Sequence, residues 1–176
     1  MIAALERPIR TLALVMALLG GVALLGLVAM TVLSVTGRNL TSIGLSNING
    51  DFELVEAGTA FAVFAFLPWC QFNRGHAAVE ILAPRFGPTL NNIIDVIAEA
   101  LMLAMWVFLI WRLWLGMADK RSYAETTFIL QYPIWWAYAA SLAAGIAVVI
   151  VATFCLFRAI DGLVTGKRAS KVAGHE

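Results

Sequence analysis

Two carboxylates lie within a long apolar segment of this chain, at a spacing that places them on one face of a helix. Asn91, Asp95 and Glu99 recur every fourth residue, so on a helix they form one polar stripe. A carboxylate inside a membrane is costly and normally faces protein or water with a partner. The stripe therefore predicts a structural ion pair or hydrogen bond, a proton or ion relay, or a helix start that leaves Asp95 among lipid head groups.

Further polar groups occur around residue 76. His76 and Glu80 are four apart and meet on one face of a helix, while Arg74 can reach a lipid phosphate or the end of a helix.

Glu53 is expected to favour the positive end of its own helix, whereas Glu56 lies further in and can also pair with a cation on a partner. The candidate structural or partner-interface residues are therefore Glu56, Arg74, His76, Glu80, Asp95 and Glu99.

Residues typical of catalysis or cofactor binding do not form a recognisable pattern in the sequence. The two histidines, His76 and His175, lie outside the apolar segments, which argues against a membrane anchor that binds haem. The sequence contains no metal-binding motif, phosphate-binding glycine loop or nucleophile motif, and no dense basic cluster indicates nucleic acid. We therefore predict no enzyme activity, no metal, no cofactor and no nucleic-acid partner.

Four long apolar segments must position the candidate groups. They cover residues 9–35, 54–72, 93–115 and 134–157, and each is close to the roughly 20 residues that a membrane-spanning helix needs. Charged residues make up 13% of the chain, against about 25% in ordinary soluble domains. The predicted fold is an all-α integral membrane protein with four transmembrane helices, forming a single membrane domain over residues 1–176 with no soluble domain.

Local patterns add detail to these four helices. The first is expected to open after Arg7, with Pro8 in its first turn, and to be retained rather than cleaved as a signal peptide. Between the second and third helices, residues 73–92 suggest a short amphipathic segment in the membrane interface. The tryptophans at 106, 111 and 114 are expected to approach the opposite interface.

Small residues recur every fourth position, which reflects either close helix packing or ordinary composition: Ala13, Ala17 and Gly21, then Ala139, Ala143 and Ala147.

The distribution of basic residues predicts the orientation. With four spans both termini share a side, and eight of the 12 lysines and arginines fall on that side. Cytoplasmic loops carry the excess of basic residues, so both termini are expected in the cytoplasm.

Three features occur in order around the end of the second apolar segment, namely Glu56, FLPW at 66–69 and RGHAAVEIL at 74–82. In these features the sequence resembles the small membrane subunit of tripartite ATP-independent periplasmic (TRAP) transporters, the DctQ-like family, and RGHAAVEIL is similar to the family's Arg-x-Gly-His-Val-x-Val-Asp stretch. Here Arg74 adjoins Gly75 directly, and an alanine and Glu80 replace the usual valine and aspartate. A second match comprises Ser122, Thr127 and LQYPIW at 130–135.

This resemblance implies a multi-pass protein of the bacterial inner membrane with three kinds of partner. These are a large DctM-like permease subunit, a periplasmic DctP-like substrate-binding protein and membrane lipids. Such transporters take up organic acids such as C4-dicarboxylates or sialic acid, driven by sodium in the studied cases. The resemblance implies that this chain steadies the large subunit, which holds the substrate and sodium sites.

Two other functions are compatible with a small four-helix membrane protein. One is an independent proton-coupled exporter that uses Glu99 or Asp95, although such exporters are usually shorter and carry their acid in the first helix. The other is a membrane anchor of a redox complex, against which the absence of histidines within the apolar segments argues.

Overall fold

Four long helices form the structure, a computed structural model that describes residues 2–39, 48–73 and 88–165. They are α1 (Ile2–Asn39), α2 (Asp51–Phe72), α3 (Pro88–Ser122) and α4 (Trp135–Thr165). Each is long and apolar enough to span a membrane, as the sequence predicts. The amphipathic segment expected between α2 and α3 lies mostly outside the described residues.

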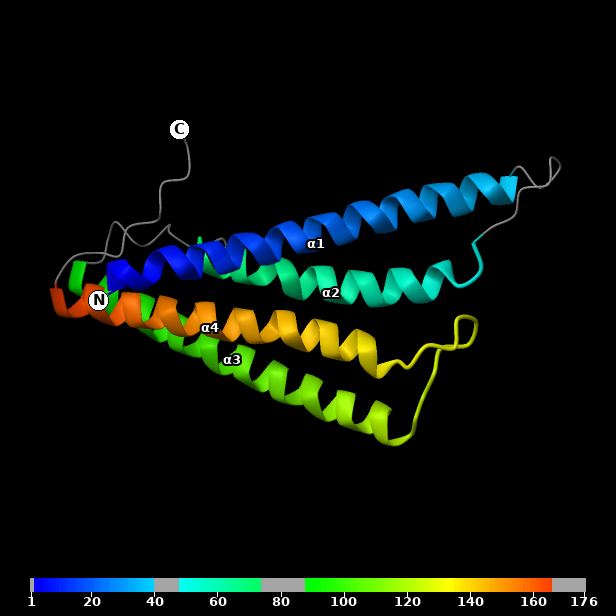
Figure 1. The fold of residues 1–176 in the computed structure, drawn as a ribbon. Helices are drawn as coiled ribbons and strands as arrows, with labels where there is room; N and C mark the ends of the chain where they lie inside the picture. The colour runs from blue at the N-terminus through cyan, green and yellow to red at the C-terminus, as the bar shows by residue number, and fades with distance from the viewer. Residues whose placement is uncertain (1, 40–47, 74–87, 166–176) are drawn as a thin grey trace.

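The helices pack in the order α1, α2, α4, α3 (Figure 1). In the most apolar stretch of α1 and of α3, only 11% of the residues are buried, against 56% in that of α4. Helix α4 therefore forms the centre of the bundle, and α1 and α3 lie outermost. We call the end where α1 begins and α4 ends the terminal end, and the opposite end the loop end. The helices lie closer together at the terminal end and diverge towards the loop end (Figure 1).

Three of the helices extend beyond the segments expected from hydropathy. Helix α1 begins at Ile2, so the expectation of Pro8 in its first turn is wrong; the residues before Pro8 include alanine, leucine and glutamate, which favour helix. Helix α3 continues through residues 116–122, which were expected to be a connection. Lys120 and Arg121 suit the negative C-terminal end of that helix. Helix α4 likewise runs on to Thr165.

Small residues bring the helices together, but at positions that differ from the predicted stripes. Ala13 is fully buried, as expected of a contact position. Two turns further on, however, a Cβ at Gly20 would lie 3.0 Å from Ala65 Cβ on α2, whereas one at Gly21 would have no atom within 4 Å. The close approach of α1 to α2 therefore occurs at Gly20, which is seven residues from Ala13 and so lies close to the same face of the helix.

Helices α3 and α4 make a similar close contact, and one tryptophan on α3 turns inward. Gly145 of α4 leaves room for Ile110 of α3, whose terminal carbon would meet any added Cβ. Trp106 is only 5% exposed and packs with Val148 and Ala152 of α4, so the expectation that it lies in an interfacial belt is wrong.

Candidate functional site

A buried chain of hydrogen bonds joins α2 to α3. Gln71 Nε2 donates to Glu99 Oε2 at 2.8 Å, and Trp106 Nε1 donates to Gln71 Oε1 at 3.3 Å. Glu99 is only 7% exposed, so its carboxylate faces protein rather than lipid. Because α2 packs mainly on α1 and α4, these side chains form a specific polar link between two helices that otherwise touch little.

The rest of the polar stripe on α3 runs towards the terminal end. Asn91 is buried and Asp95 is partly buried. Their neighbour Asn92, which lies off the predicted stripe, is also buried, and its Nδ2 donates to the carbonyl oxygen of Gly162 on α4 at 3.2 Å. Polar contacts thus join α3 to α2 and to α4.

Arg158 of α4 closes the C-terminal end of α2. One of its terminal nitrogens donates to the carbonyl oxygen of Phe72 at 3.3 Å. Its guanidinium lies 5.5 Å from the centre of the Phe72 ring and 6.0 Å from that of Phe154. The last carbonyls of a helix lack partners within it, so an arginine here satisfies one of them. The sequence alone shows only a basic residue near the end of an apolar run.

Three of the sequence-predicted residues lie outside the described residues: Arg74, His76 and Glu80. Their proposed role in orienting an interfacial segment stays a prediction. The described candidates do not form one site, because Glu99 and Asp95 lie on α3 and Glu56 lies near the start of α2, at the loop end.

The connection between α3 and α4 folds back on itself as a short hairpin. Thr126 and Pro133 form an antiparallel bridge, and Thr127 N donates to the carbonyl oxygen of Tyr132 at 3.0 Å. Gln131 has a positive φ of 52°, which reverses the chain at the tip. The hairpin leaves Phe128 almost fully exposed, at 99%, and extends beyond the ends of α3 and α4 to the start of α2 (Figure 1).

Glu53 of α2 fixes the tip of this hairpin. Its two carboxylate oxygens accept hydrogen bonds from the backbone N–H groups of Ile129 at 2.7 Å and Leu130 at 2.9 Å. Glu53 lies in the first turn of α2, as expected of a carboxylate at the positive end of a helix, but its hydrogen bonds go to the hairpin rather than to its own helix. Sequence spacing gives no signal for this contact, since the partners lie 76 and 77 positions away.

Gly50 makes room for the same hairpin. Its φ of 82° is in the left-handed region that favours glycine, and a Cβ there would lie 2.5 Å from Leu130 Cγ. At the same end, Ser34 Oγ donates to Asp51 Oδ2 at 2.6 Å, which ties α1 to the start of α2.

A groove of about 290 Å³ lies between α2, α3 and α4 at the loop end. Its polar side chains come from the start of α2, from the hairpin and from α4: Glu53, Glu56, Thr127, Tyr132, Tyr138 and Ser141. Burial raises the pKa of Tyr132, and the charges of Glu53 and Glu56 raise it further. The phenol therefore stays protonated at neutral pH and donates to the backbone carbonyl oxygen of Glu53 at 3.1 Å.

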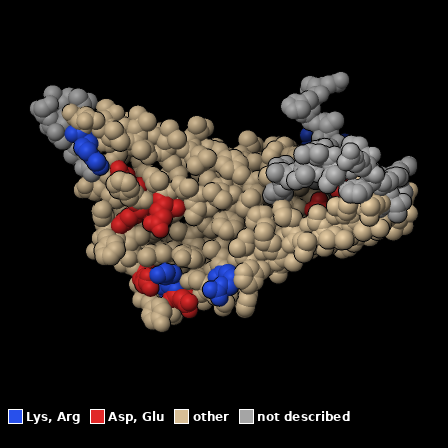
Figure 2. Space-filling view, turned by 180° about the vertical axis from the view of Figure 1, so that it is seen from behind, with Lys and Arg blue, Asp and Glu red and all other residues tan. Residues whose placement is uncertain are grey.

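Charged side chains gather around this end of the molecule. Figure 2 shows carboxylates grouped at the loop end, with lysine and arginine side chains near them. Lys120 and Glu125 form an ion pair at 2.6 Å across the start of the hairpin. The loop end therefore presents both signs of charge in a small area, which suits contact with a polar partner or with lipid head groups.

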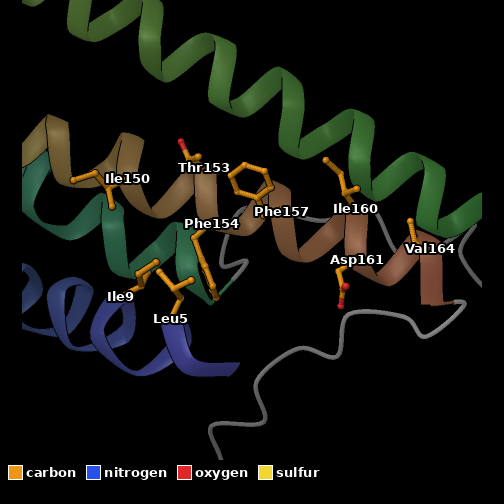
Figure 3. A pocket seen from close by; sticks show the side chains of 9 residues that line it. All are labelled: Leu5, Ile9, Ile150, Thr153, Phe154, Phe157, Ile160, Asp161 and Val164. Atoms are coloured by element: carbon orange, nitrogen blue, oxygen red, sulfur yellow. The ribbon is translucent and has the colours of Figure 1, made fainter. Parts of the chain in front are cut away.

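A second, apolar groove of about 500 Å³ lies at the terminal end, between the start of α1 and the end of α4. Figure 3 shows Leu5 and Ile9 of α1 opposite Phe154 of α4, with Asp161 further along α4. Apart from Asp161 and Thr153, the side chains that line it are hydrocarbon. Such a surface suits lipid chains or an apolar helix rather than a soluble ligand.

The described residues include no group of three or more histidine, cysteine, aspartate or glutamate side chains that could hold a metal ion. The hydrogen bonds described above join the helices to one another and hold the hairpin between α3 and α4.

Comparison with known families agrees with this description. The family model for tripartite ATP-independent periplasmic transporters, DctQ component, matches residues 27–162. Searches of curated proteins and of solved structures returned no match. The matched region runs from the last third of α1 almost to the end of α4, and includes the whole groove at the loop end and part of the groove at the terminal end. The chain therefore belongs to the DctQ family, the small permease component of TRAP transporters.

Proposed function

We propose that this chain binds the large, DctM-like membrane subunit and steadies it while that subunit carries an organic acid across the inner membrane. The match to the DctQ family over residues 27–162 carries the proposal. In this account the substrate and coupling-ion sites belong to the large subunit, and this chain holds neither. The substrate is an organic acid such as a C4-dicarboxylate or sialic acid, and sodium drives uptake.

The packing of the four helices supports a fixed, supporting role. Glu99, the buried carboxylate of α3, accepts a hydrogen bond from Gln71 of α2, so it serves to hold helices together. The hairpin between α3 and α4 is held by hydrogen bonds at its tip and its base. A body with such internal links moves as a unit, and a moving carrier needs a fixed body to move against.

The outer helices offer the surfaces for assembly. Helices α1 and α3 expose large apolar side chains along most of their length. Both lipid chains and a partner helix are apolar enough to cover these side chains. We propose that the large subunit covers part of this surface, and that the hairpin at the loop end faces the DctP-like binding protein.

That arrangement requires the loop end to face the periplasm and both termini to face the cytoplasm. Single cysteines introduced at Asn49 and Ser122 should then react with a membrane-impermeant thiol reagent in intact cells. A cysteine at Thr165 should react only after the cells are opened, because α4 ends at the terminal end. The parent protein, which has Cys70 and Cys155, measures background labelling. Labelling of Thr165 alone in intact cells would reverse the orientation.

Binding to the large subunit is tested by co-purification. When this chain, carrying an affinity tag, is expressed with the large subunit of its own transporter, the two should elute together from size-exclusion chromatography in mild detergent. An unrelated four-helix membrane protein with the same tag serves as the control. Elution of the two subunits at separate positions, with both still folded, contradicts the proposed function.

A further inference from the structure

The groove at the loop end changes from polar to apolar along α2. Glu53 and Glu56 lie at its mouth, near the start of the helix, while Ala60 and Phe64 follow on the same face one and two turns further in. Leu113 of α3 forms part of the opposite wall. The groove is therefore matched to a molecule with a polar head and an apolar chain, rather than to a uniformly polar ligand.

A buried hydroxyl group in this groove lacks a partner. Ser141 of α4 lines the groove and is only 3% exposed, and no group among the described residues hydrogen-bonds to its Oγ. A serine within a helix commonly donates to the carbonyl four residues earlier, but Ser141 does not. Because a buried hydroxyl without a partner is costly, its position indicates an acceptor supplied by a bound molecule.

Glu56 supplies a negative charge at the mouth of the groove. Both carboxylate oxygens of Glu53 are taken by the hairpin, so exposed Glu56 is the carboxylate that can meet a ligand cation. A head group that carries a cation therefore fits beside this carboxylate, at the polar end of the groove.

We propose that this groove binds a phospholipid whose head group ends in a primary ammonium, as in phosphatidylethanolamine. The ammonium pairs with Glu56, an ester carbonyl accepts from Ser141, and the acyl chain lies against Phe64. A lysine or arginine side chain of a partner protein fits the groove less well than a lipid. Its charge is at the far end of its apolar part, so on entering the groove it would carry its cation past Glu56 into the apolar part.

The experiment is native mass spectrometry of the purified chain in detergent, so it does not depend on the proposed transport function. Phosphatidylethanolamine, phosphatidylcholine and phosphatidylglycerol with identical acyl chains are added in equal amounts. Phosphatidylethanolamine should be retained about fivefold more than either of the others, since of the three only it carries an ammonium that can donate hydrogen bonds to the Glu56 carboxylate. Equal retention of the three lipids would overturn the proposal.

Two variants assign the binding to this groove. Glu56→Gln should remove most of the preference for phosphatidylethanolamine, and Asp119→Asn, at an exposed carboxylate of α3, should leave it unchanged. Ser141→Ala should lower retention of this lipid by about fivefold without lowering the Tm of the delipidated protein, because the hydroxyl has no partner within the described chain. Parent-like retention in both Glu56→Gln and Ser141→Ala would place the lipid elsewhere and refute the site.

Discussion

Replacing Glu99 with leucine should destabilise the helix bundle by about 1–3 kcal/mol, because the substitution removes the acceptor of a buried hydrogen bond from Gln71. Glu99→Gln should cost less, since its amide oxygen can still accept that bond. Thermal unfolding of the purified chain in detergent measures both effects. In the complex, Glu99→Leu should also lower the yield of the large subunit that co-purifies.

A double-mutant cycle isolates the contact from other effects of the leucine. Gln71→Leu removes the donor, and the combined variant should be less destabilised than the sum of the single variants. The coupling should be about 0.6–1.7 kcal/mol, the range found for hydrogen bonds between membrane helices. Strict additivity would show that the Gln71–Glu99 bond contributes nothing. If Glu99→Gln abolished transport while the complex still assembled, Glu99 would act as a relay rather than as a structural link.

Replacing Gly20 with leucine should force α1 away from α2 and lower the Tm strongly. An added Cβ would already meet Ala65 Cβ at 3.0 Å and the backbone oxygen of Ala62 at 3.3 Å, and neither atom can move aside as a flexible side chain would. Overpacking of this kind typically costs about 1–3 kcal/mol. Thermal unfolding in detergent checks the effect.

The adjacent residue provides a matched control. Gly21→Leu makes the same chemical change one position along α1, where an added Cβ would have no atom within 4 Å. Its Tm should stay within a degree or two of the parent value, because surface substitutions usually change stability by at most about 0.5 kcal/mol. Equal losses in the two variants would mean that the contact with α2 does not determine the cost, since the higher helix propensity of leucine gives no loss of its own.

The number of helices and their approximate positions along the chain could be predicted from the sequence, because an apolar run of about 20 residues has few other structures in a membrane. The helix ends could not, since hydropathy marks only the apolar part of a helix. The polar residues 116–122 therefore read as a connection, although they continue α3. The residue of α1 that contacts α2 could not be predicted either, because Gly20 and Gly21 are neighbours and only the packing decides which one faces α2.

The residues of the candidate site could likewise be predicted only in part from the sequence. The spacing of Asp95 and Glu99 predicts a polar face on α3, and Glu99 is buried. Its partner Gln71 gave no signal, since a glutamine near the end of an apolar run can face lipid head groups as easily as protein. The contact of Glu53 with the hairpin and the position of Ser141 could not be predicted for a related reason, because they depend on a hairpin and a groove formed by segments far apart in the sequence.

Reconstituted uptake tests the central claim most directly, namely that this chain is a necessary but not sufficient part of a transporter. Vesicles containing the large subunit, with the binding protein added outside, should take up its radiolabelled organic acid under an inward sodium gradient only when this chain is present. Vesicles that contain this chain alone should show no uptake. Robust sodium-driven uptake by this chain alone, or full uptake by the large subunit without it, would contradict the account.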